Sequence, residues 1–500
     1  MESSLIKQRG QNMPSTNLPS SSGGLNLRDS LDIMDARDCI QMDNIIPDNG
    51  SDKVRPGYVS LSTQASNTLI PYGNSGLLSA DGGIVHRIDT VTGVSTELKN
   101  TLLSDDWVHT SFTDGAGNIY TFIANGVDVA QRYNGSTLTD VGFTIPVGVK
   151  LDSPLSFKNR LYFVDEGTFN IYYGGVQSIS GALTKFSVSS FFKRGGSIVA
   201  LANWTQDAGF GMDDLFAIFS SEGEVLVYTG LSPADSNWSL RGLFQISSPI
   251  GKRCVERMGG DLLITTQQGY FPLSEVLSQD RANKVSVSDK INPVVLGKDF
   301  TKRWCIHWYS KAGWVIINAP SSTTGYQYEQ HVMNIRTGSW CRFVGMDALD
   351  WAVVGDQLFF CNQSGIFEAN KGTKDNGGYV TYYKQMAYNK FDSDMPKQAL
   401  RIKPRYNTNN NIDFYKRVNV DFKQGSLTRV QTSVTGNVSL WDEAIWDVSF
   451  WSSENQINSF KASIYSTVGT YLSIGIWGQT SEELEFYSMG LLLKAGNGDI

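Results

Sequence analysis

The sequence predicts an all-β protein, and three observations support this fold class. Aromatic residues make up 12% of the 500 residues and charged residues only 18%, a balance that favours many strands over long helices. Glycine outnumbers proline by 49 to 14, as expected where tight turns join short strands. Short runs of alternating apolar and polar residues, broken by Gly, Asn and Asp, also recur along the chain. We therefore expect many short strands and few helices.

The first 75 residues divide into two segments. Residues 1–24 are rich in Ser, Asn and Pro, which predicts a flexible arm that orders against a partner. Residues 25–75 combine many Asp, Asn, Arg and Pro residues without a regular hydrophobic pattern. Such a segment buries little of its own surface, so we interpret it as a docking or platform segment.

Residues 76–370 are predicted to form a β-propeller. Hairpin-like units, each with two alternating runs around a turn, recur about every 40 to 55 residues, the length of a four-stranded blade. They lie at 82–93, 118–135, 159–175, 214–230, 261–273, 313–320 with 331–340, and 356–370. Radial stacking would bury both faces of each small sheet, and the segment is long enough for about six to eight blades. A pair of β-sandwiches is the alternative.

Residues 371–500 are predicted to form a second β-rich domain, a platform to which the N-terminal segment also contributes. Longer strand-like runs lie at 377–391, 400–407, 414–423 and 459–477. Trp441, Trp446 and Trp451 form a spaced cluster, which we interpret as core or subunit interface because Trp carries a large apolar area. A carbohydrate-binding platform is the alternative for these three residues.

Charge and cysteine usage narrow the class of protein. The net charge is −7 and the pI is near 5.3, so bulk electrostatics do not draw the chain to nucleic acid or anionic lipid. Five cysteines without CxxC spacing argue against a disulfide framework or a thiolate zinc site; they are Cys39, Cys254, Cys305, Cys341 and Cys361. Without an apolar run of 18 residues or a secretory leader, we expect a soluble chain made in a cytoplasm, with reduced thiols.

No recognised catalytic motif is present. The sequence has no GxSxG, Walker loop or suitably placed GxGxxG, and its four histidines, His86, His109, His307 and His331, lack metal-ligand spacing. The carboxylate pairs Asp105–Asp106 and Asp213–Asp214 could not flank one glycosidic bond from a strand, because adjacent strand residues point to opposite faces. We interpret both pairs as turn or loop residues. We expect no enzyme activity, catalytic residue, cofactor or metal site.

Three blocks of sequence stand out along the chain. The N-terminal block comprises Gly24, Leu25, Asn26, Arg28 and Asp29, then Asp43, Asn44 and Pro47, then Arg55, Pro56 and Gly57. The second block is residues 223–277, and the third is Trp441, Asp442, Trp446 and Asp447. In this order the blocks resemble the tail hub or nozzle proteins of short-tailed bacteriophages, podoviruses, also called packaged DNA stabilisation proteins. The blocks span nearly the whole chain, whereas insertions such as 321–330 depart from the family's pattern.

The resemblance implies a structural protein of the virion tail, made in the host cytoplasm. It implies a hexameric ring of this chain below the portal and its adaptor, which retains packaged DNA and then conducts it during ejection. The implied partners are other copies of the chain, the portal-adaptor protein, tail fibre, spike or needle proteins, and genomic DNA that passes non-specifically, with no stable membrane association. An acidic or neutral channel would let DNA slide without binding phosphate.

The N-terminal block suggests a docking function for eight residues. These are Asn26, Arg28, Asp29, Asn44, Pro47, Arg55, Pro56 and Gly57. We hypothesise that Arg28 and Arg55 pair with carboxylates of the ring platform, while the prolines and Gly57 fix turns. The alternative is an intrachain β-arm that caps the C-terminal domain. Two other function classes stay open: a receptor-binding or glycan-degrading propeller, and a cellular propeller scaffold.

Overall fold

The computed structural model describes residues 15–207, 212–277, 286–408, 412–431, 458–459, 461–464 and 466–495. Its contacts divide the chain into two compact units. The sandwich unit is Met1–Pro56, Ser339–Cys341 and Thr373–Ile500, and the propeller unit is Gly57–Gly338 and Arg342–Gly372. Strands dominate both units, which confirms the all-β prediction. The helices among the described residues are short: α1 (Leu273–Leu277), η1 (Asp289–Ile291) and α2 (Asn292–Leu296).

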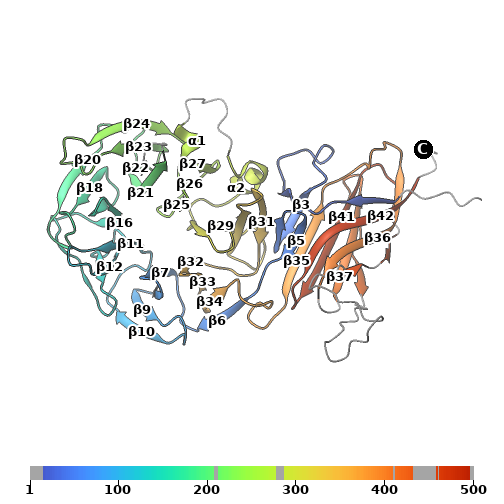
Figure 1. Cartoon of the computed structure of the whole chain (residues 1–500), viewed down its shortest axis with the longest axis horizontal. Helices are drawn as coiled ribbons and strands as arrows, with labels where there is room; N and C mark the ends of the chain where they lie inside the picture. Colours follow the sequence, from blue (N-terminus) through green and yellow to red (C-terminus); the bar gives the residue numbers. More distant parts are fainter. Residues whose placement is uncertain are drawn as a thin grey trace, which may run out of the picture. The chain divides into compact units, whose positions relative to one another are not determined.

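Seven successive groups of antiparallel strands run through the propeller unit: six are separate small sheets, and the sixth group in chain order belongs to a larger sheet (Figure 1). The first two sheets are β7 (Thr68–Tyr72), β8 (Gly76–Asp81), β9 (Ile84–Ile88) and β10 (Ser95–Lys99), then β11 (Val108–Thr113), β12 (Ile119–Ala124), β13 (Gln131–Tyr133) and β14 (Leu138–Asp140). The third is β16 (Leu151–Phe157), β17 (Arg160–Asp165), β18 (Asn170–Tyr173) and β20 (Thr184–Ser187), beside a parallel pair, β15 (Gly142–Thr144) and β19 (Ser180–Ala182).

The remaining sheets continue the pattern. The fourth is β21 (Ile198–Asp207), β22 (Met212–Ser220), β23 (Glu224–Thr229) and β24 (Ser239–Gln245), and the fifth is β25 (Val255–Met258), β26 (Asp261–Thr266) and β27 (Gly269–Pro272). The sixth contains β28 (Cys305–Tyr309), β29 (Trp314–Pro320) and β30 (Tyr328–Asn334), followed along the chain by β31 (Ser339–Phe343). The seventh is β32 (Asp350–Val354), β33 (Gln357–Asn362), β34 (Gly365–Ala369) and β6 (Tyr58–Ser62).

The first strands of these sheets form a closed ring. In order, β7, β11, β16, β21, β25, β28 and β32 each contact the next, and β32 contacts β7 again. The sheets are therefore the blades of a seven-bladed propeller, and these first strands are its innermost strands, around the central axis. Seven lies within the predicted range of about six to eight blades.

A strand from the start of the unit closes the seventh blade. Strand β6 pairs antiparallel with β34, from Ser62 opposite Ile366 to Tyr58 opposite Ala369. The propeller unit therefore begins at Gly57, earlier than the predicted start at Gly76. The sequence did not indicate this strand because its partner lies at the other end of the unit. Pairing across the closure point leaves no open sheet edge there.

Apolar side chains fill the spaces between neighbouring blades. Between the third and fourth blades, for example, Tyr162 and Phe157 pack against Phe216, with ring centroids 4.8 and 5.2 Å away. Tyr228 and Trp238 stack in the same cluster at 5.1 Å. Each blade thus buries both faces, which one isolated small sheet could not do.

The sandwich unit contains two packed sheets. One sheet has the order β39 (Asn458–Ser459), β36 (Lys397–Asn407), β42 (Glu485–Ala495), β5 (Ser51–Val54) and β4 (Ile45–Asp48), with β1 (Ser15–Leu18) paired to β42 and β40 (Ala462–Ser463) to β36. The other has β3 (Asp38–Asp43), β35 (Val380–Met386), β41 (Leu472–Thr480), β37 (Asp413–Val420) and β38 (Thr428–Gln431), with β2 (Gly24–Leu25) parallel to β3. Buried Tyr382 and Phe486 join the two sheets at a ring-centroid distance of 5.9 Å.

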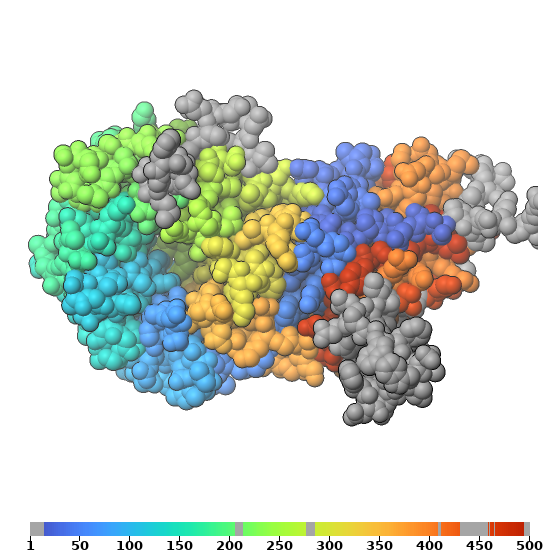
Figure 2. All heavy atoms as spheres, viewed as in Figure 1, coloured from blue at the N-terminus to red at the C-terminus, as the bar shows by residue number. Residues whose placement is uncertain are grey.

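The two ends of the chain build this unit together, as predicted for the platform domain. Figure 2 shows the N-terminal residues, in blue, among the orange and red residues of the C-terminal region. One expectation needs correction: residues 1–24 were predicted as a flexible arm, yet Ser15–Leu18 form β1 on β42. The long β42 offers an edge to which a short polar segment can add by backbone hydrogen bonds. Within the described ranges, no helix is long and apolar enough to cross a membrane.

Candidate functional site

Asn26 organises the beginning of the predicted docking segment. Its buried side chain donates hydrogen bonds to Asp29 Oδ2 at 2.8 Å and to Asp38 Oδ2 at 2.7 Å. Its Oδ1 accepts from the backbone N–H groups of Arg28 and Asp29, both at 3.1 Å. This is an Asx turn, which explains why a short amide side chain is needed at this position.

Arg55 anchors the end of the same segment. Its side chain is 1% exposed, donates from Nε to Asn44 Oδ1 at 2.9 Å, and forms a bidentate pair with Asp375 at 2.8 and 2.6 Å. Asn44, at a positive φ of 58°, donates in turn to the carbonyl of Thr381 at 2.8 Å. Within the sandwich unit, these charge-assisted bonds join the N-terminal segment to the start of the C-terminal region.

The other docking candidates lie apart from this pair. Arg28 is 46% exposed and its Nε contacts Asp29 at 2.7 Å. Pro47 lies in β4 opposite Asp52, and the Pro56 carbonyl accepts from Arg55 at 3.1 Å. Gly57 opens the propeller unit, where its N–H donates to the Gly372 carbonyl at 2.9 Å. The structure therefore joins Asn44 with Arg55, and Asn26 with Arg28 and Asp29, but does not gather the eight docking candidates into one site.

The predicted aromatic cluster is a separate case. Trp441, Trp446 and Trp451 lie outside the described residues.

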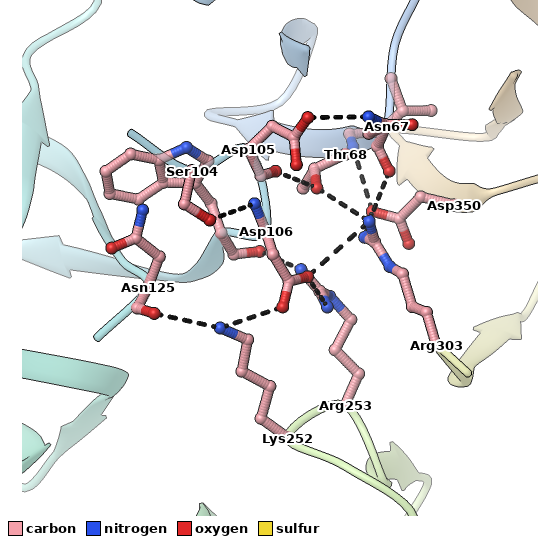
Figure 3. A network of polar contacts seen from close by, with 12 residues as sticks. Asn67, Thr68, Ser104, Asp105, Asp106, Asn125, Lys252, Arg253, Arg303 and Asp350 are labelled. Carbon is pink, nitrogen blue, oxygen red and sulfur yellow. Dashed lines mark hydrogen bonds and ion pairs between the residues drawn. The ribbon is translucent and has the colours of Figure 1, made fainter. Parts of the chain in front are cut away.

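A network of ion pairs crosses the axis of the propeller (Figure 3). Asp106 lies just before β11 of the second blade, and Arg253 just before β25 of the fifth. Arg253 Nη1 contacts Asp106 Oδ1 at 2.5 Å, and its Nη2 donates to the Trp107 carbonyl at 2.6 Å. The second and fifth blades are three places apart, the greatest separation in a ring of seven. The pair must therefore bridge the axis at the ends of the innermost strands.

Further cations extend this network to other blades. Lys252 contacts Asp106 at 3.2 Å and Asp152 of the third blade at 3.3 Å. Arg303, just before β28 of the sixth blade, pairs with Asp350 of the seventh at 2.8 Å and lies 3.7 Å from Asp106. Figure 3 also shows Arg303 reaching the first blade, where its Nη1 donates to the Asn67 carbonyl at 2.6 Å. We call six charged residues the axial network: Asp106, Asp152, Lys252, Arg253, Arg303 and Asp350.

The cations of the axial network keep Asp106 and Asp350 ionised. Burial alone would raise the pKa of Asp106, but the charges of Arg253, Lys252 and Arg303 outweigh it and hold that pKa well below its ordinary value. Burial likewise opposes ionisation of Asp350, yet Arg303 and its neighbours lower the Asp350 pKa. The arrangement braces non-adjacent blades by charge, and no reacting group is needed for that.

The structure also corrects and refines the predictions for the carboxylate pairs. Asp105 and Asp106 lie between β10 and β11, as predicted for loop residues, and bond to different partners: Asp105 accepts from Asn67 at 2.7 Å. The loop prediction for Asp213 and Asp214 was wrong, because both lie in β22 of a hairpin longer than expected. Asp214 pairs there with Lys158 at 2.8 Å. The sequence missed the axial network because nothing local shows which loops meet at a ring's centre.

A second polar cluster is buried between the fifth and sixth blades. Glu329 is fully buried and pairs with Lys298 at 2.6 Å, while His331 Nε2 lies 3.4 Å from the same carboxylate. The Tyr270 hydroxyl and His331 Nδ1 share a hydrogen bond at 2.7 Å. Because each charged group has a close partner, we interpret the cluster as a structural bridge between blades.

Comparisons with known proteins add no family assignment. No family model matches the sequence, and no curated protein matches it. Among solved structures, a chain of the mitotic checkpoint complex is 10% identical with a TM-score of 0.39, over 63% of this chain and 92% of that chain. The computationally designed protein Ika8 is 12% identical with a TM-score of 0.37, over 63% of this chain and 98% of that chain. Both TM-scores are too low to support an argument.

Proposed function

We propose that this protein is a tail hub or nozzle subunit of a short-tailed bacteriophage. In this proposal, six copies form a ring below the portal and its adaptor, retain the packaged DNA and conduct it during ejection. The proposal begins from the resemblance of the three sequence blocks, of which the N-terminal block is the most distinctive. It is a structural role, with other copies of the chain and the adaptor as partners.

The observation that carries the proposal is how the signature residues bond. Asn26, Asn44 and Arg55 are buried, and each uses its side chain to fix the N-terminal segment within the sandwich unit. The residues that resemble the family signature thus hold the N-terminal segment in the sandwich unit by hydrogen bonds. A chance match would not be expected to fall on the polar residues that hold this segment in place.

A basic groove on the sandwich unit supports self-association. It has a volume of about 410 Å³ and lies along β36, β42 and β1, where Arg401, Lys403, Arg405 and Lys461 contribute cationic side chains. In β36 these cations alternate with buried Ile402 and Pro404, so the basic face is opposite the core. The chain as a whole carries a net charge of −7. An acidic surface of a neighbouring copy would complement the groove in a head-to-tail ring.

The axial network bears on the path of DNA. Ion pairs between the second and fifth blades cross the propeller axis, so a duplex would have no free passage through a single propeller. In the proposed ring, DNA would run along the common axis of the six copies. The acidic net charge would then favour sliding over binding.

Copy number in purified particles tests the proposal. Quantitative mass spectrometry should find half as many copies of this chain as of the portal protein, since a sixfold ring would sit on a twelvefold portal. An excess in a multiple of three would instead indicate a fibre or spike. Absence from particles would overturn the virion function and favour a cellular propeller scaffold.

Charge reversal tests the ring contact itself. Replacing Arg401 and Lys403 by Glu should abolish ring formation in size-exclusion chromatography with light scattering, because the groove would repel its acidic partner. Exposed Lys185 in the propeller unit provides the control, and Lys185→Glu should leave the ring intact. An unchanged ring in the double variant would exclude this groove as the subunit contact.

The docking function of the N-terminal segment is tested by Arg28→Ala. Arg28 is 46% exposed, so its loss should weaken attachment of the ring to its neighbours without unfolding the chain. Arg37 is a matched control: it is 61% exposed and pairs with nearby Asp35 at 3.0 Å. If Arg28→Ala, Arg37→Ala and the unaltered chain attach equally well, the docking hypothesis is wrong. The segment would then be an intrachain β-arm that caps the C-terminal domain.

A further inference from the structure

Three potential metal ligands meet beside the propeller axis, between the sixth and seventh blades. They are Cys305 and His307 on β28, and Asp350 at the start of β32. The thiol sulfur, an imidazole nitrogen and a carboxylate oxygen all lie within 4.8 Å of one another. Cys305 is fully buried and the Asp350 side chain is 2% exposed.

The strand geometry explains why these side chains converge. Cys305 and His307 are two positions apart on β28, so both point to the same face of the strand. Strands β28 and β32 are neighbours in the ring of innermost strands. Asp350 therefore approaches the Cys-x-His pair from the next blade, 43 residues further along the chain than His307. No metal-ligand spacing is visible in the sequence, because the third residue belongs to another blade.

Two of the ligand atoms lie at the distance of a long ion pair. His307 Nε2 and Asp350 Oδ1 are 3.6 Å apart, too far for a good hydrogen bond. Among the described residues, neither atom has a hydrogen-bond partner, although both are buried. In a tetrahedral zinc site, neighbouring nitrogen and oxygen ligands stand about 3.3 Å apart, given metal–ligand distances near 2.0–2.1 Å. A small contraction would bring both atoms to one metal ion.

The second carboxylate oxygen is already held in place. Asp350 Oδ2 accepts from the Leu69 N–H at 3.0 Å and pairs with Arg303 at 2.8 Å. These contacts orient Oδ1 toward His307, in the way that outer partners of a metal site fix the ligating oxygen. A dication with one thiolate and one carboxylate carries no net charge, and the charge of Arg303 also has Asp106 within 3.7 Å.

We propose that Cys305, His307 and Asp350 bind a zinc ion that links the sixth and seventh blades. A thiolate, an imidazole and a carboxylate together suit zinc better than magnesium or calcium, which prefer oxygen ligands alone. The thiol releases its proton on binding, and a water molecule takes the fourth position. The site would stabilise the propeller by linking the sixth blade to the seventh, which β6 closes. This zinc-site proposal does not depend on the proposed function.

Cobalt substitution of the full chain tests this site directly. Co²⁺ added to metal-free protein should bind with one equivalent, give the visible absorption of tetrahedral cobalt, and give a near-ultraviolet thiolate-to-cobalt charge-transfer band. Zn²⁺ should displace it and raise the midpoint of thermal unfolding. No binding, or an octahedral spectrum without the thiolate band, would overturn the proposal.

Two cysteine variants assign the ligand. Cys305→Ser should lose the charge-transfer band, whereas Cys361→Ser should keep it, although Cys361 is equally buried and pairs with Asp350 across the seventh blade. A band that persists in Cys305→Ser, or disappears in Cys361→Ser, would show that the assignment is wrong. If Cys305→Ser does not fold by circular dichroism, His307→Gln retains the thiol and should bind Co²⁺ at least tenfold more weakly; unchanged affinity would equally refute the site.

Discussion

Buried charges with complete sets of partners are the residues on which this molecule most depends. Arg55 in the sandwich unit and Glu329 in the propeller unit are each almost inaccessible and each contact an opposite charge within 2.6 Å. Removing one member of such a pair leaves the other buried without compensation, which costs more free energy than the pair itself contributes. Exposed pairs such as Arg37 with Asp35 behave differently, because water solvates each partner when the other is lost.

Arg55→Ala should therefore lower the free energy of unfolding by about 3 kcal/mol, since Asp375 and Asn44 would both lose their buried partner. Urea denaturation followed by circular dichroism measures the change. Arg37→Ala, from the same segment, should lie within about 0.5 kcal/mol of the unaltered chain. Equal effects of the two substitutions would mean that the buried guanidinium does not anchor the segment.

Glu256 on β25 gives a pH-dependent prediction. Burial raises its pKa from 4.5 to about 7. Since the folded-state pKa is the higher one, the carboxylate destabilises the fold progressively as pH rises from about 4.5, and fully above about 7. Glu256→Gln should remove this penalty. Its stability relative to the unaltered chain should increase by about 2 kcal/mol between pH 5 and pH 8.

The measurement is urea denaturation at the two pH values, with a chelator in the buffer. Glu275→Gln, at an exposed position of α1, serves as the control for the loss of one carboxylate and is measured at the same two pH values. A Glu256→Gln difference that does not change with pH would mean that the carboxyl titrates normally in the folded protein.

At the scale of elements, the closure of the seventh blade is the least replaceable junction. Gly365 begins β34 with a φ of 146°, and a Cβ there would lie 2.3 Å from the Ser62 carbonyl oxygen of β6. Only glycine can adopt that backbone conformation and allow β6 to approach so closely. The joint between the two ends of the propeller unit thus depends on one missing methyl group.

Gly365→Ala should cost about 3 kcal/mol of stability, because it adds backbone strain and pushes β6 from the sheet. Gly313→Ala separates the two effects, since Gly313 has a φ of 68° but open space around its Cβ position. That control should cost only about 1 kcal/mol. Thermal or urea unfolding measures both, and equal costs would show that contact with β6 is unimportant.

The alternation of apolar and polar residues along the sequence predicts the hairpins inside single blades. The segments 159–175, 214–230 and 356–370 alternate in polarity, and the structure forms β17–β18, β22–β23 and β33–β34 there. Alternation is a property of neighbouring residues, so it is visible in sequence. The partnership of Tyr58 with Ala369, and the meeting of Asp106 with Arg253, depend on ring closure. Residues so far apart in the sequence leave no local pattern. The axial network and the cluster of Cys305, His307 and Asp350 were missed for the same reason.

For the molecule as a whole, the axial network matters because it links blades that do not touch. A double-mutant cycle with Asp106→Asn and Arg253→Gln should give a coupling energy of about 1 kcal/mol, modest because Asp106 is partly exposed. Arg257→Gln in the same blade is the control: Arg257 bonds to Thr205 at 3.0 Å, so its effect should add to that of Asp106→Asn. Additive effects of Asp106→Asn and Arg253→Gln would mean that the charges do not interact across the axis.

The net charge of the whole chain predicts weak binding to DNA. If the proposed function is right, the conduit for DNA should not retain phosphate, and a net charge of −7 per chain acts against non-specific binding. The basic groove of Arg401, Lys403, Arg405 and Lys461 is the exception, and it could face either a neighbouring copy or DNA. If it faces a neighbour, fluorescence anisotropy should show no binding of duplex DNA between about 50 and 200 mM salt. Binding that weakens linearly on a logarithmic salt scale, and that the Arg401→Glu, Lys403→Glu variant loses, would instead make the groove a phosphate contact. The same variant thus distinguishes the two uses of the groove: loss of the ring indicates a subunit contact, and loss of DNA binding indicates a wall of the channel.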